Sequence, residues 1–415
     1  MCPSSTHEQT DPPAAVDERR GVALCLSGGG FRAALFHLGA LRRLAEVGAL
    51  GAVDTVSSVS GGSILAAHLA ERLRPWPEPG VAVTDWETRV AAPFRAFCAE
   101  GLRTGPLLER WLLPWNWPRP STSIEALADA YQKRLTRATL DQLPERPLFV
   151  FCATDLVFGV NWEMSRRRIG DWQAGYVVPA PPLPVARAVA ASSCFPPAFG
   201  PLPMPLDPAT LQGGRYPAGE RRDDLVRHLE LSDGGLYDNL GLEPVWKDHR
   251  IVLVSDGGAP FGVDAARAPF QLLRRYLDVA GAQGASLRKR WLISSFKNGA
   301  LEGAYWGIGS ATARYGANAP AGYEARLVES TISAVRTDLD AFLPDECGVL
   351  ENHGYLLAEA ALRRHQPALV VHDAPLVAPR PDLLGAQRAA AALATSAQRL
   401  SPRRWLERRR PATGG

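Results

Sequence analysis

The chain has 415 residues, enough for one large domain or two of average size, and either would bury a substantial core. Its 46 Lys and Arg against 43 Asp and Glu leave a net charge of +3, which gives no reason to expect nucleic acid as a partner. No apolar run approaches the length needed to span a bilayer, so any membrane contact is expected to be peripheral.

The start of the chain and the cysteines both bear on where the protein works. Residues 1–20 are polar, mix both signs of charge and lack an apolar stretch, which predicts a disordered segment without a signal peptide. The six cysteines lack the spacing of zinc ligands: Cys2, Cys25, Cys98, Cys152, Cys194 and Cys347. Several of them fall in apolar stretches expected to be strands. Buried free thiols in a reducing compartment, the cytoplasm, are preferred to disulfides, and no metal is expected.

Residues 21–70 contain two successive units of strand, glycine turn and helix. The apolar run 22–26 stops at Ser27-Gly28-Gly29-Gly30, and a helical pattern follows. The second strand runs into serines at 57–60, and Gly61-Gly62 opens the next helix. Ser60 falls at this second turn, where the bend exposes a hydroxyl above the first N–H groups of a helix. The sequence therefore predicts Ser60 as a nucleophile, in an S-x-S-x-G version of the usual G-x-S-x-G elbow.

The first glycine turn suits the other half of an acyl-transfer site. Consecutive glycines let several N–H groups point at one place, as in an oxyanion hole. Gly28, Gly30 and Ala33 also satisfy the dinucleotide fingerprint G-x-G-x-x-A. That fingerprint needs a second strand ending in an acidic residue, and this one ends in serines. The oxyanion hole is therefore preferred, and no cofactor is expected.

The string SGGGFRAALFHLGAL, followed by a serine elbow at Ser60, resembles the patatin-like phospholipase family. In that family a G-G-G-[RK] oxyanion loop precedes a G-x-S-x-G nucleophile, and the partner is the Asp of a later D-G-[GA] motif. The resemblance implies Ser60 as nucleophile, with Ser58 where the family has Gly. It also implies an oxyanion loop made of Gly28, Gly29, Gly30 and Arg32.

Two D-G-G strings compete to supply the catalytic aspartate, Asp233 and Asp256. Asp233 lies in the longer family-like string LSDGGLYDNLGLEP and is followed by Asn239, as in the family, whereas Ala259-Pro260 follow the second string. We therefore expect Asp233 to be the base and Asp256 to end a neighbouring strand. The string 191–199, ASSCFPPAF, is also similar to a family motif and is interpreted as an apolar wall near the site or as core.

The resemblance implies a serine acyl hydrolase that cleaves fatty acyl esters of lipids or phospholipids through a Ser–Asp dyad. A Ser-His-Asp esterase is the rival. His68 is too far along its helix from Ser60 and His37 has apolar neighbours, but position leaves four others open: His249, His353, His365 and His372. A catalytically weak or inactive lipid-binding module is the third alternative, because Ser58 departs from the pattern.

The fold implied is α/β, a three-layer α/β/α sandwich with a mostly parallel central sheet and a helical C-terminal part. The catalytic domain is expected over residues 21–375, with insertions at about 72–122 and 205–224. Residues 376–415 are expected to form an Ala/Arg-rich tail.

Two stretches are candidates for peripheral membrane contact. Trp111, Trp115 and Trp117 lie among leucines and arginines in the first insertion. Indole rings favour the membrane–water boundary, so the segment is either a lid or interfacial patch, or a proline-bent piece of core. In the tail, arginines surround Trp405 and either bind a membrane surface or form a solvated end.

Overall fold

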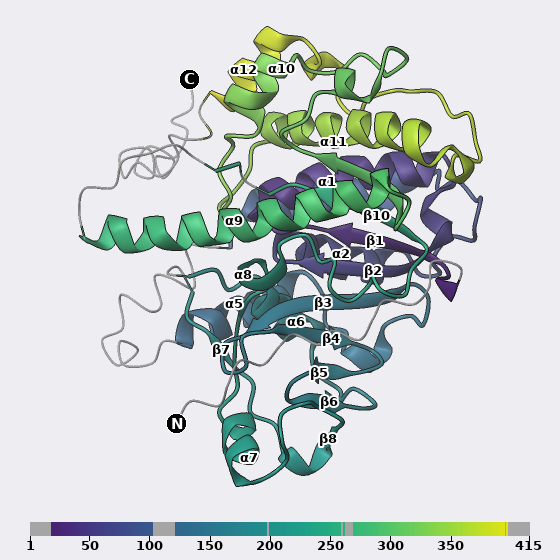
Figure 1. Ribbon diagram of the computed structural model, residues 1–415. Helices are drawn as coiled ribbons and strands as arrows, with labels where there is room; N and C mark the ends of the chain where they lie inside the picture. Colours follow the sequence, from purple (N-terminus) through teal and green to yellow (C-terminus); the bar gives the residue numbers. More distant parts are fainter. Residues whose placement is uncertain are drawn as a thin grey trace.

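The computed structural model describes residues 18–102, 121–196, 199–258, 260–261, 269–394 and 396. Within these ranges the strands join in a single sheet of eleven strands, with helices packed around it (Figure 1). None of the helices in these ranges is long and apolar enough to cross a bilayer.

The centre of the sheet is parallel. Its order is β11-β10-β1-β2-β3, with bounds Glu302–Gly307, Ile251–Asp256, Val22–Leu26, Val53–Val59 and Leu148–Asp155. Most of their residues are buried, as expected for parallel strands packed on both faces. The predicted α/β fold with a mostly parallel central sheet is therefore confirmed.

Beyond β3 the sheet continues with antiparallel pairs. The path runs through β4 (Asn161–Ser165), β5 (Ile169–Asp171), β6 (Gly175–Val177) and β8 (Leu211–Gln212). Two strands lie off this path, β9 (Glu230–Asp233) and β7 (Leu202–Pro203), and β9 pairs with both β3 and β7. The expected exposed insertion around 205–224 contains β8 and most of α7 (Glu220–Arg227).

The two longest helices of one layer, α1 (Gly30–Glu46) and α11 (Pro344–His365), pack closely against each other. A glycine from each helix permits this approach. A Cβ at Gly39 would collide with the backbone of Glu351, and one at Gly354 would collide with the backbone of Phe36. This contact packs the expected helical C-terminal part against the helix that follows the first glycine turn.

The remaining helices complete the layers around the sheet. They are α2 (Gly61–Arg72), α3 (Ala92–Glu100), α5 (Thr122–Arg134), α6 (Val185–Ser192), α8 (Gly235–Asp238), α9 (Pro269–Lys297), α10 (Ala325–Leu327) and α12 (Ala386–Leu393). α12 lies in the expected tail, yet its Ala389 and Leu393 are buried. Residues 1–17, 103–120 and 397–415 lie outside the described residues, and the domain boundaries stay a prediction.

Candidate active site

Ser60 stands alone between β2 and α2, as the sequence predicts. Its φ of 50° and ψ of −115° make it the one non-glycine residue with positive φ in the described ranges. Backbone strain of this kind persists where the surrounding structure enforces it, and it gathers at functional sites. A Cβ on Gly61 would collide with Gly30, and one on Gly62 with Leu26, so the two glycines let α2 begin directly against the first glycine turn.

Hydroxyl groups hold the Ser60 turn in place. The N–H of Ser60 donates to Oγ of Ser192 at 2.9 Å, and that hydroxyl donates to the carbonyl of Cys152 in β3 at 2.6 Å. Oγ of Ser63 lies 2.8 Å from Oγ of Ser192. The strained residue is thereby tied to β3 through the last residue of α6, so Ser192 positions the elbow.

Ser58, the departure from G-x-S-x-G, belongs to the same network. Its hydroxyl donates to the carbonyl of Val150 at 3.1 Å and accepts a hydrogen bond from Ser63 at 3.0 Å. A hydroxyl has one proton to donate, and Ser58 gives it to Val150, so Ser63 is the donor in the hydrogen bond between the two hydroxyls. The serine found where the family has glycine therefore links the elbow to β3.

The first glycine turn lies against the elbow. A Cβ on Gly28 would be 3.2 Å from Cβ of Ser60. The N–H of Gly28 is occupied, because it donates to the carbonyl of Asn239 at 3.1 Å. Gly29 and Gly30 have φ values of 140° and 59°, and their N–H groups have no acceptor in the part of the chain that the structure describes. Two of the three predicted glycines are thus free to donate.

Arg32 has a different place from the one implied by the family motif. Its side chain is buried, with Nε and Nη2 donating to the carbonyl of Gly257 at 3.2 and 2.7 Å. Nη1 donates to the carbonyls of Ser333 and Val335 at 3.0 and 2.9 Å. These bonds commit the guanidinium to the loops of Gly257 and of Ser333 and Val335, so it is not free to donate to an oxyanion.

The strand that ends at Asp233 and the strand that precedes Ser60 end at neighbouring residues of β3. Val59, the last residue of β2, pairs with Cys152, and Asp233, the last residue of β9, pairs with the next residue of β3, Ala153. Ala153 also pairs with Trp162 of β4, so β9 occupies the same side of β3 as β2 and continues its line. β9 is antiparallel to β3, so the strands that carry Ser60 and Asp233 run in opposite directions.

Burial gives Asp233 the properties of a base near neutral pH. Its pKa is raised to about 6, chiefly because the carboxyl is fully buried, while the Gly235 N–H and the Ser60 hydroxyl oppose the shift. Oδ1 accepts the Gly235 N–H at 2.8 Å. Oδ2 has no hydrogen-bond partner among the described residues. Thr154 anchors the strand end by donating to the carbonyl of Asp233 at 2.8 Å. Oδ2 is thus the oxygen left for a proton.

Asp256, the rival aspartate, is engaged by other groups. Its Oδ2 lies 2.5 Å from Nζ of Lys289 and accepts the Tyr305 hydroxyl at 2.7 Å, and Oδ1 accepts the Gly258 N–H at 2.9 Å. Lys289 and these hydrogen bonds outweigh burial and lower the pKa of Asp256. A carboxylate held in its charged form by a cation is a poor proton acceptor, so the geometry favours Asp233.

The described histidines have partners elsewhere. His37 contacts Oγ of Ser255, His68 the carbonyl of Val90 and His353 the carbonyl of Ile308. Burial lowers the pKa of these three to about 4. His249 contacts Thr55, and no histidine in the described ranges hydrogen-bonds to Ser60 or Asp233. The triad finds no support in this part of the chain.

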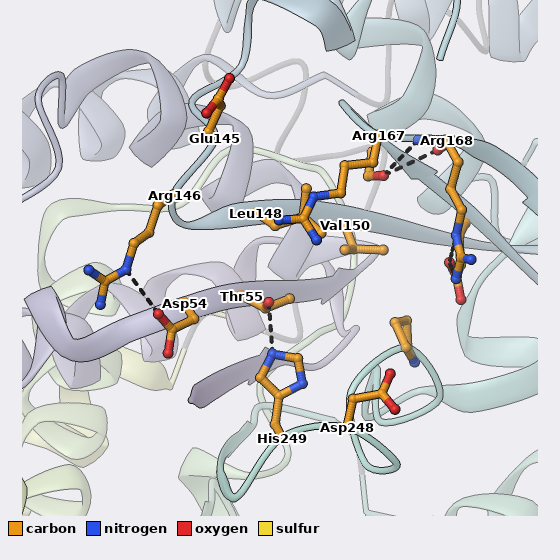
Figure 2. A pocket seen from close by; sticks show the side chains of 13 residues that line it. Asp54, Thr55, Glu145, Arg146, Leu148, Val150, Arg167, Arg168, Asp248 and His249 are labelled. Atoms are coloured by element: carbon orange, nitrogen blue, oxygen red, sulfur yellow. Dashed lines mark hydrogen bonds and ion pairs between the residues drawn. The ribbon is translucent and has the colours of Figure 1, made fainter. Parts of the chain in front are cut away.

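A hollow of about 490 Å³ lies elsewhere on the molecule (Figure 2). It is lined by the first residues of β2 and β3, such as Thr55 and Leu148, and by His249. At about 3.3 Å per residue, Thr55 lies about 16 Å along β2 from Ser60. Most of the charged side chains that line the hollow form ion pairs, for example Arg146 with Asp54 at 2.9 Å. This hollow is separate from the candidate active site.

Other predicted residues fall outside the site or outside the described ranges. Trp111, Trp115, Trp117 and the basic tail are not among the described residues. The five described cysteines are free and buried. In the string 191–199 Phe199 is buried and Phe195 is exposed, but the contribution that sequence reasoning missed is the Ser192 hydroxyl. In the sequence, Asn239 only helps to distinguish the two D-G-G strings. In the structure its carbonyl accepts the Gly28 N–H and so holds the glycine turn.

In serine acyl hydrolases the nucleophile is a serine on a strained strand-to-helix turn, which is the position of Ser60 here. The family model for patatin-like phospholipase matches residues 24–246, more than half of the chain. The chain belongs to this family. A comparison with curated proteins found no match.

Solved structures of two proteins are among those similar to this chain. Human GIVD cytosolic phospholipase A2 is 14% identical with a TM-score of 0.39, and the match covers 94% of this chain and 62% of that one. Its complex with methyl gamma-linolenyl fluorophosphonate and terbium chloride is 13% identical, TM-score 0.44, over 86% and 60%. VipD from Legionella pneumophila is 14% identical, TM-score 0.35, over 84% and 67%. The chain thus spans about three fifths of the phospholipase's length.

Proposed function

We propose that this chain is a serine acyl hydrolase that cleaves fatty acyl esters of lipids or phospholipids through a dyad of Ser60 and Asp233. One observation carries the proposal: β2 and β9 end at consecutive residues of β3, beside the elbow serine and a buried carboxylate. Among the described residues, Oδ2 of that carboxylate has no hydrogen-bond partner. The intact glycine turn beside Ser60 supports it.

In this mechanism Oδ2 of Asp233 removes the proton from Ser60 as Oγ attacks the ester carbonyl. The carbonyl oxygen becomes an anion, and the N–H groups of Gly29 and Gly30 are the candidate donors that stabilise it. Gly28 shapes the turn instead of donating. Protonated Asp233 returns its proton to the departing alcohol, and water activated by Asp233 then hydrolyses the acyl-enzyme.

The proposal also covers the compartment in which the protein works and its contact with a membrane. Buried free thiols fit a reducing compartment, so we assign the protein to the cytoplasm, with peripheral contact to a membrane that holds its substrate. Contact through Trp111, Trp115, Trp117 and the basic tail stays a prediction. The rival lipid-binding module would keep the same fold and lose only the activated serine.

A fluorophosphonate probe tests the dyad directly, because it labels only an activated serine. We expect wild type to be labelled, Ser60→Ala to be unlabelled and Asp233→Ala to be labelled far more slowly. Ser193→Ala is the matched control, since its hydroxyl contacts Val189 and Tyr131 instead of the elbow. Wild type that stays unlabelled with and without added lipid, beside a reactive control hydrolase, would favour the binding module. Labelling that survives in Ser60→Ala would point to another serine.

A further inference from the structure

The described side chains in the N-terminal half of α9 are exposed or half-buried. α9 connects the parallel strands β10 and β11, so it runs back against them and begins at the sheet edge where strands end. This is also the edge at which Ser60 follows β2. None of its described side chains between residues 272 and 283 is buried, and in Figure 1 this half extends past α8 and the sheet.

One face of α9 is apolar and exposed. Leu272, Tyr276, Val279 and Leu287 are 41%, 64%, 40% and 59% exposed. At 3.6 residues per turn these four positions fall within an arc of about 80°, with the polar Gln283 among them. We call these four side chains the α9 face. A continuous exposed apolar stripe on a helix indicates an interaction surface.

The charges of α9 indicate what kind of surface it meets. The helix carries six Lys and Arg and a single acid, Asp278. Arg290 and Lys297 continue the line of the α9 face toward the C-terminus, are exposed, and have no ion-pair partner among the described residues. Arg288 and Lys289 point inward and pair with Asp238 and Asp256. An apolar stripe flanked by cations is the composition of helices that lie on anionic bilayers.

The inward side of α9 is fastened to α8, the helix that follows Asp233. Arg288 donates to the carbonyl of Tyr237 at 2.9 Å, which fastens α9 to α8, and α8 begins two residues after Asp233. Leu236 on α8 and Phe261 beyond β10 are also exposed, and the Phe261 ring lies 4.1 Å from the Arg275 guanidinium. Exposed apolar side chains therefore lie on α9, on α8 and beyond the end of β10.

We propose that the α9 face is the surface by which this chain docks on an anionic lipid bilayer, so that acyl chains enter at the edge of Ser60. A second copy of the chain is the alternative occupant, and a parallel pairing of two such faces would bring Arg290 and Lys297 of one copy near those of the other. The role in substrate delivery rests on the proposed hydrolase function, but the docking itself does not.

Vesicle sedimentation of the full chain tests the docking. We expect wild type to bind vesicles of phosphatidylcholine mixed with phosphatidylglycerol and to bind pure phosphatidylcholine weakly. The variant Leu272→Ser/Tyr276→Ser/Val279→Ser should bind the mixed vesicles about tenfold or more weakly. Arg290→Gln/Lys297→Gln should lose only the preference for phosphatidylglycerol. The matched control is Val371→Ser/Val377→Ser, which replaces two valines that are 56% and 58% exposed. The N–H of Val371 donates to the carbonyl of Val47, the residue that follows α1.

Two further readouts separate the explanations. Light scattering reports self-association, and hydrolysis of a short-chain soluble ester reports the chemistry without a membrane. Docking is supported if the triple variant loses vesicle binding while soluble ester hydrolysis and the control variant are unchanged. It is overturned if wild type fails to bind mixed vesicles, if the triple variant binds as wild type does, or if the α9 face instead holds a dimer that the variant dissociates. Absence of ester hydrolysis in wild type would count against the hydrolase alone, and sedimentation would still decide the docking.

Discussion

Ser60 and Asp233 reach each other from opposite directions along one line of the sheet. β2 ends beside Cys152 and β9 ends beside Ala153, so the two chain ends stop at adjacent steps of β3. Between them, the bend at Ser60 turns its side chain out of the strand line. The same register that buries the Asp233 carboxyl therefore brings it to the serine, and burial raises its pKa to about 6.

Asp233→Asn should lose activity and gain stability. Losing the base is expected to cost about 10²- to 10⁴-fold in kcat/KM. A carboxyl whose folded pKa exceeds its unfolded value destabilises the fold once pH rises through the folded pKa. Urea unfolding should therefore find Asp233→Asn more stable than wild type by about 2 kcal/mol at about pH 8, with the difference gone at about pH 4.

The same pKa sets the pH dependence of catalysis. Because Asp233 must be ionised to accept the Ser60 proton, kcat/KM for a soluble ester should fall as pH decreases, with an apparent pKa near 6. A pH–rate profile that stays flat through this range would argue against Asp233 as the base. An inflection that persists in Asp256→Asn would exclude the other aspartate as its source.

Asp256→Asn should change stability in the opposite direction. The pKa of Asp256 is lowered by Lys289 and Tyr305, so its charged form stabilises the fold at neutral pH. Replacing it is expected to cost about 2 kcal/mol at about pH 7, and less as pH falls and the wild-type carboxylate is protonated. Unfolding curves of the two asparagine variants should therefore lie on opposite sides of wild type, and curves on the same side would contradict the roles assigned here.

Ser192→Ala should slow the chemistry without weakening substrate binding. It removes the acceptor of the Ser60 N–H, and a misplaced nucleophile is expected to lower kcat about tenfold to a hundredfold. KM for a soluble ester should stay unchanged, and Ser192→Thr, which keeps a hydroxyl, should restore most of kcat. Ser193→Ala is the control one residue away. Equal losses in both alanine variants would indicate a general effect on α6 instead of positioning of Ser60.

Sequence reasoning found the two turns because their chemistry is local. Gly61 and Gly62 are needed because a Cβ at either position would collide with the first strand or its glycine turn. Such a local requirement is visible as a short motif in the sequence. The role of Ser192 depends on a hydrogen bond to a residue 132 positions away, and no local pattern encodes that distance. Arg32 illustrates the opposite case, since it sits in the motif but its donors are taken by carbonyls of distant loops.

Strand direction was the other point that sequence could not settle. A strand that stops at Asp-Gly-Gly can bring its aspartate to the site from either side of the sheet edge. β9 does so antiparallel, in the space that β2 vacates when the chain turns at Ser60. The choice follows from the register against β3, a long-range property. The identity of the aspartate could therefore be predicted from the sequence, whereas the direction of the strand that carries it could not.

A buried pair of carboxyl groups supplies a last prediction, away from the site. Oδ1 of Asp155 accepts the Val157 N–H at 2.6 Å, Oδ1 of Asp171 accepts the Ala174 N–H at 2.6 Å, and Oδ2 of each lacks a donor among the described residues. Burial and the neighbouring Asp155 raise the pKa of Asp171 to about 8, as expected if the pair shares one proton. Stability should therefore fall as pH rises through 8.

Asp171→Asn tests the shared proton, because its amide can donate to Asp155 at any pH. By urea unfolding we expect it to match wild type at about pH 6 and to exceed it by about 1 to 2 kcal/mol at about pH 9. Asp171→Ala should be less stable than wild type at the lower pH, since the Gln173 and Ala174 N–H groups lose their acceptor. A gap between Asp171→Asn and wild type that does not change with pH would mean that the two carboxyls do not share a proton.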